Sequence, residues 1–300
     1  MQRRHSLECH SDFASSCGIK IRRGQNARPS LALDDRVLKV LASQSTIVSK
    51  AEQKRFAECL SQSLQFHEIL RRKFRKNQQS NDIIGLINIA RASGELDEAN
   101  WRCFLAAHFG RSSAEQKQFQ SASNLLCAFN DRPYWTWNRV TKNPKAFRAW
   151  LKDNRRKLQT LGFGNHRKYE SKSPDILWRV FESYRELAEE YGGPAELLKV
   201  AGDRRADVDQ FDVLYLRLRP LFRFGRTGRF DFLALLNDLN LISAVPTSSY
   251  LLGSTGPKQG ALRLWGMRKI EQLELLASDF AQKLSISSLN VEDALCNWQK

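Results

Sequence analysis

Apolar residues recur every three or four positions along most of this chain, which is the spacing of one face of an α-helix. The first firm example follows Ser49, which forms a capping box with Glu52. Phe56, Leu60 and Leu64 then lie four residues apart. Alternating β-branched runs joined by hairpin turns, the pattern of β-strands, are nearly absent. The sequence therefore predicts an all-α fold.

Prolines and polar residues mark where several of these helices begin. Pro144 and Pro174 each stand at the first position of a predicted helix, where the missing N–H of proline costs nothing. Asp97 is placed to cap a further helix, and Asn290 to cap the last one. A single long amphipathic helix is predicted over about residues 261–284.

The organisation of the chain follows from composition and from one short motif. Residues 1–30 mix arginine, serine, glycine and glutamine without a period, which is typical of a loose basic segment. Residues 31–300 are the predicted helical region, either one body or two packed lobes. Residues 206–240 have the form of a helix, a short glycine-containing turn and a second helix. This is the form of a helix-hairpin-helix DNA-binding unit.

The charge balance narrows the class of partner. Lysine plus arginine number 48 against 32 aspartates and glutamates, a formal net charge of +16. Such an excess is typical of proteins that bind a polyanion, and double-stranded DNA is the first expectation. No apolar run approaches the roughly 20 residues of a membrane-spanning helix, and no apolar segment of a signal peptide follows the first arginines. We therefore expect a cytoplasmic, monomeric DNA-binding protein with no membrane partner.

The histidines and cysteines do not predict a metal or a cofactor. The chain has five histidines and six cysteines, with no C-x-x-C pair and no cluster at the spacing of metal ligands. This argues against zinc, an iron–sulfur cluster and a disulfide framework. We expect activity without a metal ion or cofactor.

Two glycine turns within residues 223–266 carry the strongest candidate chemistry. Glycine can adopt positive φ and lets backbone N–H groups approach a ligand closely, and a helix that begins there directs unpaired N–H groups at it. Phosphate is the natural occupant, although two ordinary turns with solvated arginines would give the same pattern. With two cations from a second basic stretch, the predicted phosphate-binding residues are Arg167, Lys168, Gly225, Arg226, Thr227, Gly228, Arg229, Gly256 and Lys258.

Aromatic and amide side chains gather in two further stretches. Residues 133–138 hold three aromatic residues, and residues 162–171 combine glycines, an amide, an imidazole, cations and a phenol. Such residues can stack on an extruded base and bond to its edge. A hydrophobic plug and a plain basic loop are the alternative interpretations. The predicted base-pocket residues are Trp135, Trp137, Asn165, His166, Tyr169, Tyr250, Asn297 and Trp298.

Three segments carry a family resemblance when they are taken together. They are residues 163–171 (FGNHRKYES), residues 224–231 (FGRTGRFD) with the glycine run at 253–261, and residues 293–300 (DALCNWQK). This combination resembles the alpha-glutamyl/putrescinyl thymine pyrophosphorylase family, clade 3, from about Ser49 onward. The resemblance implies a fold of the helix-hairpin-helix DNA glycosylase superfamily. It also implies a role with hypermodified pyrimidines of phage DNA, either in making them or in excising them.

The resemblance further implies an aspartate downstream of the hairpin, but the corresponding position holds Ser248. Another carboxylate would have to replace it, or the mechanism differs. The candidates, in order of preference, are Asp231, Asp293 and Asp238. Asp231 and Asp238 are seven residues apart and so share one helix face, about 10 Å from each other along the axis. An acidic residue in a first helical turn also interacts well with the helix dipole, so a capping role is the competing interpretation.

Three functions remain open at this stage. A DNA glycosylase that flips and excises modified bases of phage DNA, as an antiviral defence, is favoured. A transferase that displaces pyrophosphate from an activated 5-hydroxymethyl pyrimidine to install an amine would need the same extruded base. A non-catalytic DNA-binding module is the third possibility.

Overall fold

The structure is a computed structural model that describes residues 31–44, 46–75, 82–110, 119–131, 133–164, 167–199 and 207–300. These residues form α-helices, one short 3-10 turn and no strand, which confirms the all-α prediction. In chain order the α-helices are α1 (Leu31–Ser43), α2 (Lys50–Arg75), α3 (Ile83–Ala92), α4 (Leu96–Phe109), α5 (Gln120–Leu126), α6 (Trp137–Lys142), α7 (Pro144–Asp153), α8 (Arg155–Gln159), α9 (Pro174–Glu190), α10 (Pro194–Leu197), α11 (Asp207–Arg217), α12 (Arg226–Asp238), α13 (Gly256–Trp265), α14 (Ile270–Leu284) and α15 (Ser288–Trp298). The predicted loose segment 1–30 lies outside the described residues.

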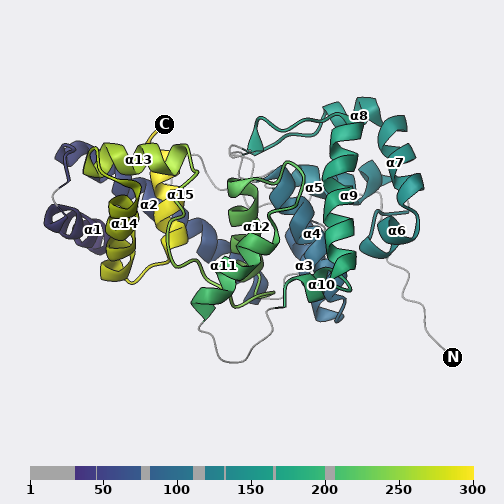
Figure 1. The fold of residues 1–300 in the computed structure, drawn as a ribbon, viewed down its shortest axis with the longest axis horizontal. Coiled ribbons are helices and arrows are strands. Elements are labelled where there is room, and N and C mark those ends of the chain that lie inside the picture. Colours follow the sequence, from purple (N-terminus) through teal and green to yellow (C-terminus); the bar gives the residue numbers. More distant parts are fainter. Residues whose placement is uncertain are drawn as a thin grey trace.

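The helices enclose two separate hydrophobic cores. The larger core is built by α3 to α12 around stacked aromatic rings, among them Phe104 and Tyr184 at 3.9 Å between ring centroids. The smaller core is built by α1, α13, α14, α15 and the first half of α2, around Phe56 and Trp298. Figure 1 shows the two groups of helices at opposite ends of an elongated molecule, with α11 and α12 between them.

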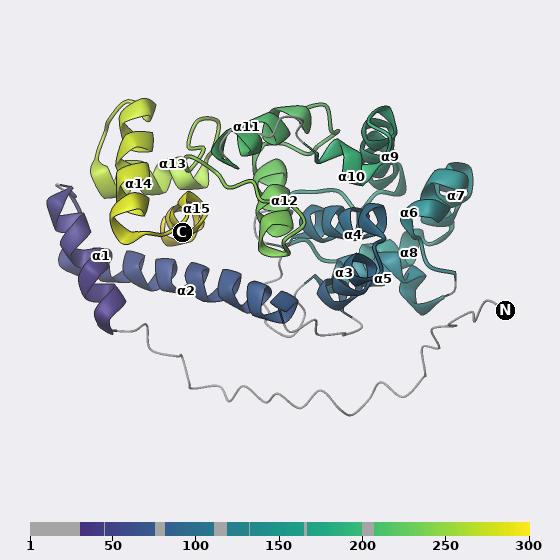
Figure 2. The same ribbon diagram turned by 90° about the horizontal axis from the view of Figure 1, so that it is seen from below.

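Helix α2 joins the two lobes. Its 26 residues span about 39 Å at 1.5 Å per residue, and Figure 2 shows it running from beneath the smaller lobe to the edge of the larger one, below α12 and beside α3. Phe56 and Leu60 lie in the smaller core, whereas Leu70 lies in the larger one. Because one continuous helix contributes to both cores, the lobes share a rigid element.

Several predicted helix starts are confirmed. The backbone N–H of Glu52 donates to the Ser49 hydroxyl at 3.3 Å, directly before α2. Pro144 and Pro174 are the first residues of α7 and α9. A helix start leaves backbone N–H groups without a partner in the helix. Ser49 supplies a side-chain acceptor for such a group, and each proline has no N–H that needs one.

Other predicted boundaries are wrong. The helix expected over 261–284 is two helices, because Gly266 adopts φ 87 between α13 and α14. Asn290 lies inside α15, and Ser287 caps that helix by accepting from the N–H of Leu289 at 3.2 Å. Asp97 does not cap α4; its carboxylate accepts from the N–H of Ala195, at the start of α10, at 2.8 Å.

Within the described part of the chain, no helix is long and apolar enough to cross a membrane.

Candidate functional site at the start of helix α12

The turn between α11 and α12 has the predicted helix–turn–helix form. Leu221 and Phe224 are buried in the larger core and anchor the turn from beneath. The one residue of the turn with positive φ is Arg223, at 53°, whereas Gly225, the N-cap residue of α12, has φ −66°. The expectation that glycine supplies positive φ here is therefore wrong for Gly225.

Gly228 is needed for a different reason, namely close packing. A Cβ atom at this position would lie 2.5 Å from Nη1 of Arg167 and 3.2 Å from Cδ2 of Phe224. The guanidinium of Arg167 therefore rests on the bare backbone of the first turn of α12. The two unusual stretches of the sequence, 162–171 and 223–231, meet at this contact.

Arg167 is a buried cation rather than an exposed one. It is 4 % exposed, its Nε donates to the backbone oxygen of His108 at 3.2 Å, and its Nη2 donates to that of Arg223 at 3.4 Å. Its Nη2 also lies 3.4 Å from Glu170. Burial lowers the pKa of Arg167 below its usual value, while the charges of Glu170 and Asp231 act in the opposite direction. Arg167 thus holds the basic loop, α4 and the hairpin together.

Arg226 is also engaged by the protein. Its side chain is 10 % exposed, forms an ion pair with Glu292 of α15 at 2.5 Å, and donates to the backbone oxygens of Ser249 and Tyr250 at 2.9 and 3.0 Å. Burial opposes its charged form, but the charges of Glu292 and Asp231 outweigh burial and raise the pKa of Arg226. The residue that the sequence assigns to phosphate binding therefore ties α12 to the smaller lobe.

Asp231 is half-buried, and its negative charge acts to raise the pKa of both Arg167 and Arg226, although burial still leaves the pKa of Arg167 lowered. Because α12 begins at Arg226, Asp231 stands in the second helical turn rather than the first. The attraction of a carboxylate to a helix N-terminus falls off beyond the first turn. A capping role therefore explains Asp231 less well than the sequence alone suggested.

The other two candidate carboxylates have different surroundings. The side chain of Asp238 is fully buried; it lies 3.0 Å from Nε of Arg71 and also bonds to His67, both on α2. This carboxylate links α12 to the second half of α2 and is enclosed by protein. Asp293 is 8 % exposed on α15 and accepts from Nδ2 of Asn297 at 2.8 Å. Of the three, Asp231 is the one beside the hairpin and the basic loop.

The remaining phosphate-binding candidates divide into engaged and exposed groups. Arg229 stacks 4.1 Å above the ring centroid of Tyr215 and donates to its backbone oxygen at 3.0 Å. Thr227 is half-buried at the start of α12, whereas Lys168 and Lys258 are exposed. The two lysines are therefore the candidates whose charges face solvent.

The second glycine turn is a packing site between helices. A Cβ atom at Gly256 would lie 2.9 Å from Sγ of Cys296, and one at Gly260 would lie 2.3 Å from the backbone oxygen of Leu295. These two glycines let α13 approach α15 closely. Gly253, with φ 74°, does supply the positive φ that the sequence predicts for a turn.

The predicted aromatic base pocket is not gathered in one place. Trp135 and Trp137 are 1 % and 8 % exposed and belong to the larger core, so the hydrophobic-plug interpretation describes them correctly. Trp298 is buried in the smaller core, beside Phe56. Tyr169, in contrast, is 83 % exposed, two residues after Arg167.

The other members of the predicted pocket are dispersed as well. Tyr250 is half-buried near the ring of Tyr215, at 4.7 Å between centroids, and its hydroxyl donates to Asp212. Asn297 lies near the end of α15. Asn165 and His166 lie outside the described residues.

Three residues of the site were not predicted to act there. Glu170 and Glu292 are the acids that hold Arg167 and Arg226, and Glu170 is the one acid within the basic stretch 162–171, which could have identified it. His108 is 1 % exposed, and burial together with the charges of Arg167 and Arg223 keeps its pKa well below the usual range. The imidazole is therefore neutral.

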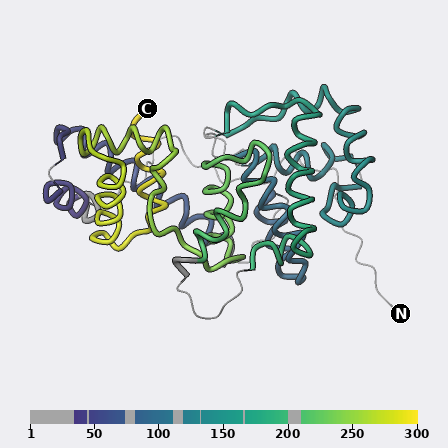
Figure 3. The backbone as a smooth tube through the Cα atoms, viewed as in Figure 1, coloured from purple at the N-terminus to yellow at the C-terminus, as the bar shows by residue number. Residues whose placement is uncertain are grey.

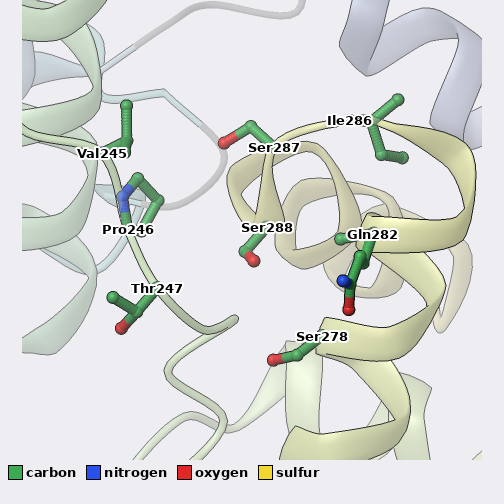
Figure 4. Close-up of a pocket in the computed structure, with 9 residues that line it drawn as sticks. Val245, Pro246, Thr247, Ser278, Gln282, Ile286, Ser287 and Ser288 are labelled. Carbon is green, nitrogen blue, oxygen red and sulfur yellow. The ribbon is translucent and has the colours of Figure 1, made fainter. Parts of the chain in front are cut away.

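A hollow of about 410 Å³ lies between the loop after α12 and the junction of α14 with α15, as Figure 4 shows. Hydroxyl, amide and small apolar groups line it, and none of its lining residues is charged. They are Val245, Pro246, Thr247, Ser278, Ala281, Gln282, Ile286, Ser287 and Ser288. None of the predicted site residues is among them.

Comparison with known proteins gives one match. The family model of the alpha-glutamyl/putrescinyl thymine pyrophosphorylases, clade 3, matches residues 39–300. No curated protein and no solved structure matches the chain significantly.

Proposed function

We propose, from the premise that the chain belongs to the alpha-glutamyl/putrescinyl thymine pyrophosphorylase family, clade 3, that this protein acts on a modified pyrimidine of double-stranded DNA. The observation that carries the proposal is Asp231, a half-buried carboxylate in the second turn of α12 whose charge acts on the guanidinium groups of both Arg167 and Arg226. The chain's net charge of +16 supports DNA as the partner.

The start of α12 is suited to hold a phosphate of the strand. The first N–H groups of a helix, here those of Arg226, Thr227 and Gly228, have no acceptor within the helix and carry the positive end of its dipole. Lys168, next to Arg167 on the loop that contacts α12, and Lys258, on α13, add exposed cations. A phosphate held there would bring its nucleotide close to Asp231, and Tyr169 is free to stack on a base.

Excision is the reaction that the contacts support best. The carboxylate of Asp231 would take a proton from water as the water oxygen bonds to the anomeric carbon, while the N-glycosidic bond breaks and the pyrimidine leaves with the bonding electrons. The negative charge of Asp231 would also stabilise the positive charge that develops on the sugar. The positive charges of Arg167 and Arg226 would help to hold the carboxylate in place.

Transfer of an amine is the second candidate, and the family description favours it. The amine nitrogen would bond to the methylene carbon at position 5 as the bond from that carbon to the pyrophosphate oxygen breaks. Such a reaction requires cations for the pyrophosphate, but Arg167 and Arg226 already donate to protein oxygens. For this reason excision is the better supported of the two.

One product analysis separates these reactions. The purified protein is incubated with phage DNAs that carry different pyrimidine modifications, with and without an added amine, and the products are identified by mass spectrometry. Free base together with alkali-labile sites is the expected result. Pyrophosphate and a heavier nucleoside that require the amine would establish transfer instead. The absence of both from every modified DNA that the protein binds would contradict an enzymatic function.

A further inference from the structure

A dense cationic surface lies on α7, α8 and the end of α6, away from the residues considered so far. Residues 142–157 contain seven lysines and arginines against one aspartate, an excess of six in a chain whose total excess is 16. All seven basic side chains are exposed. They are Lys142, Lys145, Arg148, Lys152, Arg155, Arg156 and Lys157.

Few carboxylates neutralise this surface. Arg148 and Lys152 share Asp175, at 3.9 and 3.8 Å, and Lys157 pairs with Asp131 at 2.7 Å. These pairs are exposed, and exposed pairs contribute at most about 1 kcal/mol, so a polyanion can displace them.

The other four cations have no ion-pair partner among the described residues. They are Lys142, Lys145, Arg155 and Arg156.

A single short segment connects this surface with the start of α12. Nζ of Lys172 donates to the backbone oxygen of Gln159, the last residue of α8, at 3.0 Å. Five residues earlier, Arg167 rests on Gly228 in α12. The backbone between these two positions spans at most about 18 Å. Figure 3 shows the chain leaving α8, passing near α12 and returning to α9.

We propose that the cations of residues 142–157 bind backbone phosphates of the duplex that flanks the nucleotide held at α12. This inference rests on the proposed function. Phosphates follow one strand at about 3.4 Å intervals. The backbone of residues 167–172 spans up to about 18 Å, and the side chains of Arg167 and Lys172 add to this distance, so the surface would meet the duplex several nucleotides from the target. The hairpin then positions the target nucleotide, and α7 with α8 supplies affinity that does not depend on sequence.

Burial of the apolar residues favours DNA over an anionic membrane as the partner. A helix that lies on a membrane needs an exposed apolar face. Phe147 and Leu151, which form the apolar face of α7, are fully buried in the larger core. No large apolar side chain of residues 142–157 is among the exposed ones. The surface of residues 142–157 therefore presents positive charges to a partner but no apolar face that a membrane could bind.

The test compares two double variants that remove equal charge. Arg155→Gln/Arg156→Gln changes α8, and Lys54→Gln/Arg55→Gln changes an adjacent exposed pair on α2 in the smaller lobe. The dissociation constant for a duplex long enough to cover both sites is measured over a range of salt concentrations. We expect the α8 variant to lower the slope of log K against log salt by about two units and the α2 variant to leave it unchanged. In a footprinting experiment, the α8 variant should protect fewer phosphates than the parent on one flank of the target nucleotide.

Each other outcome has a definite meaning. Equal slopes for the α8 variant and the parent would overturn this inference and leave the proposed function standing, provided the parent binds DNA and processes it. A parent that binds no duplex DNA would overturn both. If the α8 variant lost binding to phosphatidylserine vesicles but kept its DNA slope, the surface would be a membrane contact and the inference would be wrong.

Discussion

The substitution Gly228→Ala tests how tightly the basic loop is seated on α12. The new Cβ would lie 2.5 Å from Nη1 and 3.2 Å from Cζ of Arg167. Arg167 cannot swing away without breaking its bonds to the backbone oxygens of His108 and Arg223. Such overpacking costs about 1–3 kcal/mol, whereas alanine in a helix gains at most about 1 kcal/mol over glycine. We expect a net loss of stability of about 1–2 kcal/mol.

Urea denaturation followed by tryptophan fluorescence measures this difference in stability. Two further variants show whether the loss comes from the contact with Arg167. Gly162→Ala is the control, because its Cβ would meet nothing closer than Oγ of Ser121 at 3.9 Å; it should be neutral or slightly stabilising. In an Arg167→Ala background the cost of Gly228→Ala should disappear, which gives a coupling energy of about 2 kcal/mol. A Gly228→Ala variant as stable as the parent, or more stable, would refute the close seating of Arg167.

Three further predictions concern other parts of the structure. Asp238→Ala leaves His67 and Arg71 on α2 without their carboxylate partner, so it should lower the free energy of unfolding by about 1–3 kcal/mol in urea denaturation. An unchanged value would contradict its role as a link between α12 and α2. Arg226→Ala should also destabilise the fold, without changing the slope of log K for DNA binding against log salt. Lys258→Ala, at an exposed position, should instead lower that slope by about one unit and leave stability unchanged. The opposite result would mean that Arg226 binds phosphate and Lys258 supports the fold. Burial raises the pKa of Glu274 above 4.5, partly opposed by backbone N–H donors, so the folded chain holds this proton more tightly than the unfolded chain. The free energy of unfolding of the parent, relative to that of Glu274→Gln, should therefore be highest below pH 4.5 and should fall as the pH rises through the raised pKa. Unfolding of both proteins at several pH values measures this. A difference between the two proteins that does not change with pH would contradict the prediction.

The helices were predictable from sequence where local chemistry sets their ends. Ser49, Pro144 and Pro174 act within one turn of their own position, so pattern and capping suffice to locate α2, α7 and α9. Asp97 and Asn290 have equally good local patterns but different roles, because their partners come from distant parts of the chain or from packing. Local signals fail where a long-range contact decides.

The candidate site was predictable in part for the same reason. The sequence identified the glycine hairpin and the basic loop as unusual, and their meeting through Arg167 and Gly228 explains why both are present. The sequence also assigned Arg167, Arg226 and Arg229 to phosphate binding, with solvated arginines as the alternative. Burial of Arg167 and of Arg226 depends on acids at positions 170 and 292 and on backbone oxygens from other elements. Glu170 is only three residues from Arg167, but Glu292 and the backbone oxygens come from distant parts of the chain and have no fixed spacing in the sequence.

The aromatic residues show the limit of composition as a guide. A cluster of tryptophans is compatible with a stacking platform and with a core, and only their location in the fold distinguishes the two. The apolar faces of α4, α7 and α9 bury Trp135 and Trp137. In the sequence, α4 precedes the two tryptophans and α7 and α9 follow them. Tyr169, in contrast, is exposed although Arg167, two residues earlier, is buried.

The rate of the Asp231→Asn variant on modified DNA tests the central proposal most directly. The measurement is the single-turnover rate of base release, made together with the dissociation constant for the same duplex and the free energy of unfolding. A catalytic carboxylate predicts a loss of about 10²-fold or more in rate, with DNA affinity and stability retained. A variant that releases the base at the parent rate would show that Asp231 is not the catalytic group and that the mechanism proposed here is wrong.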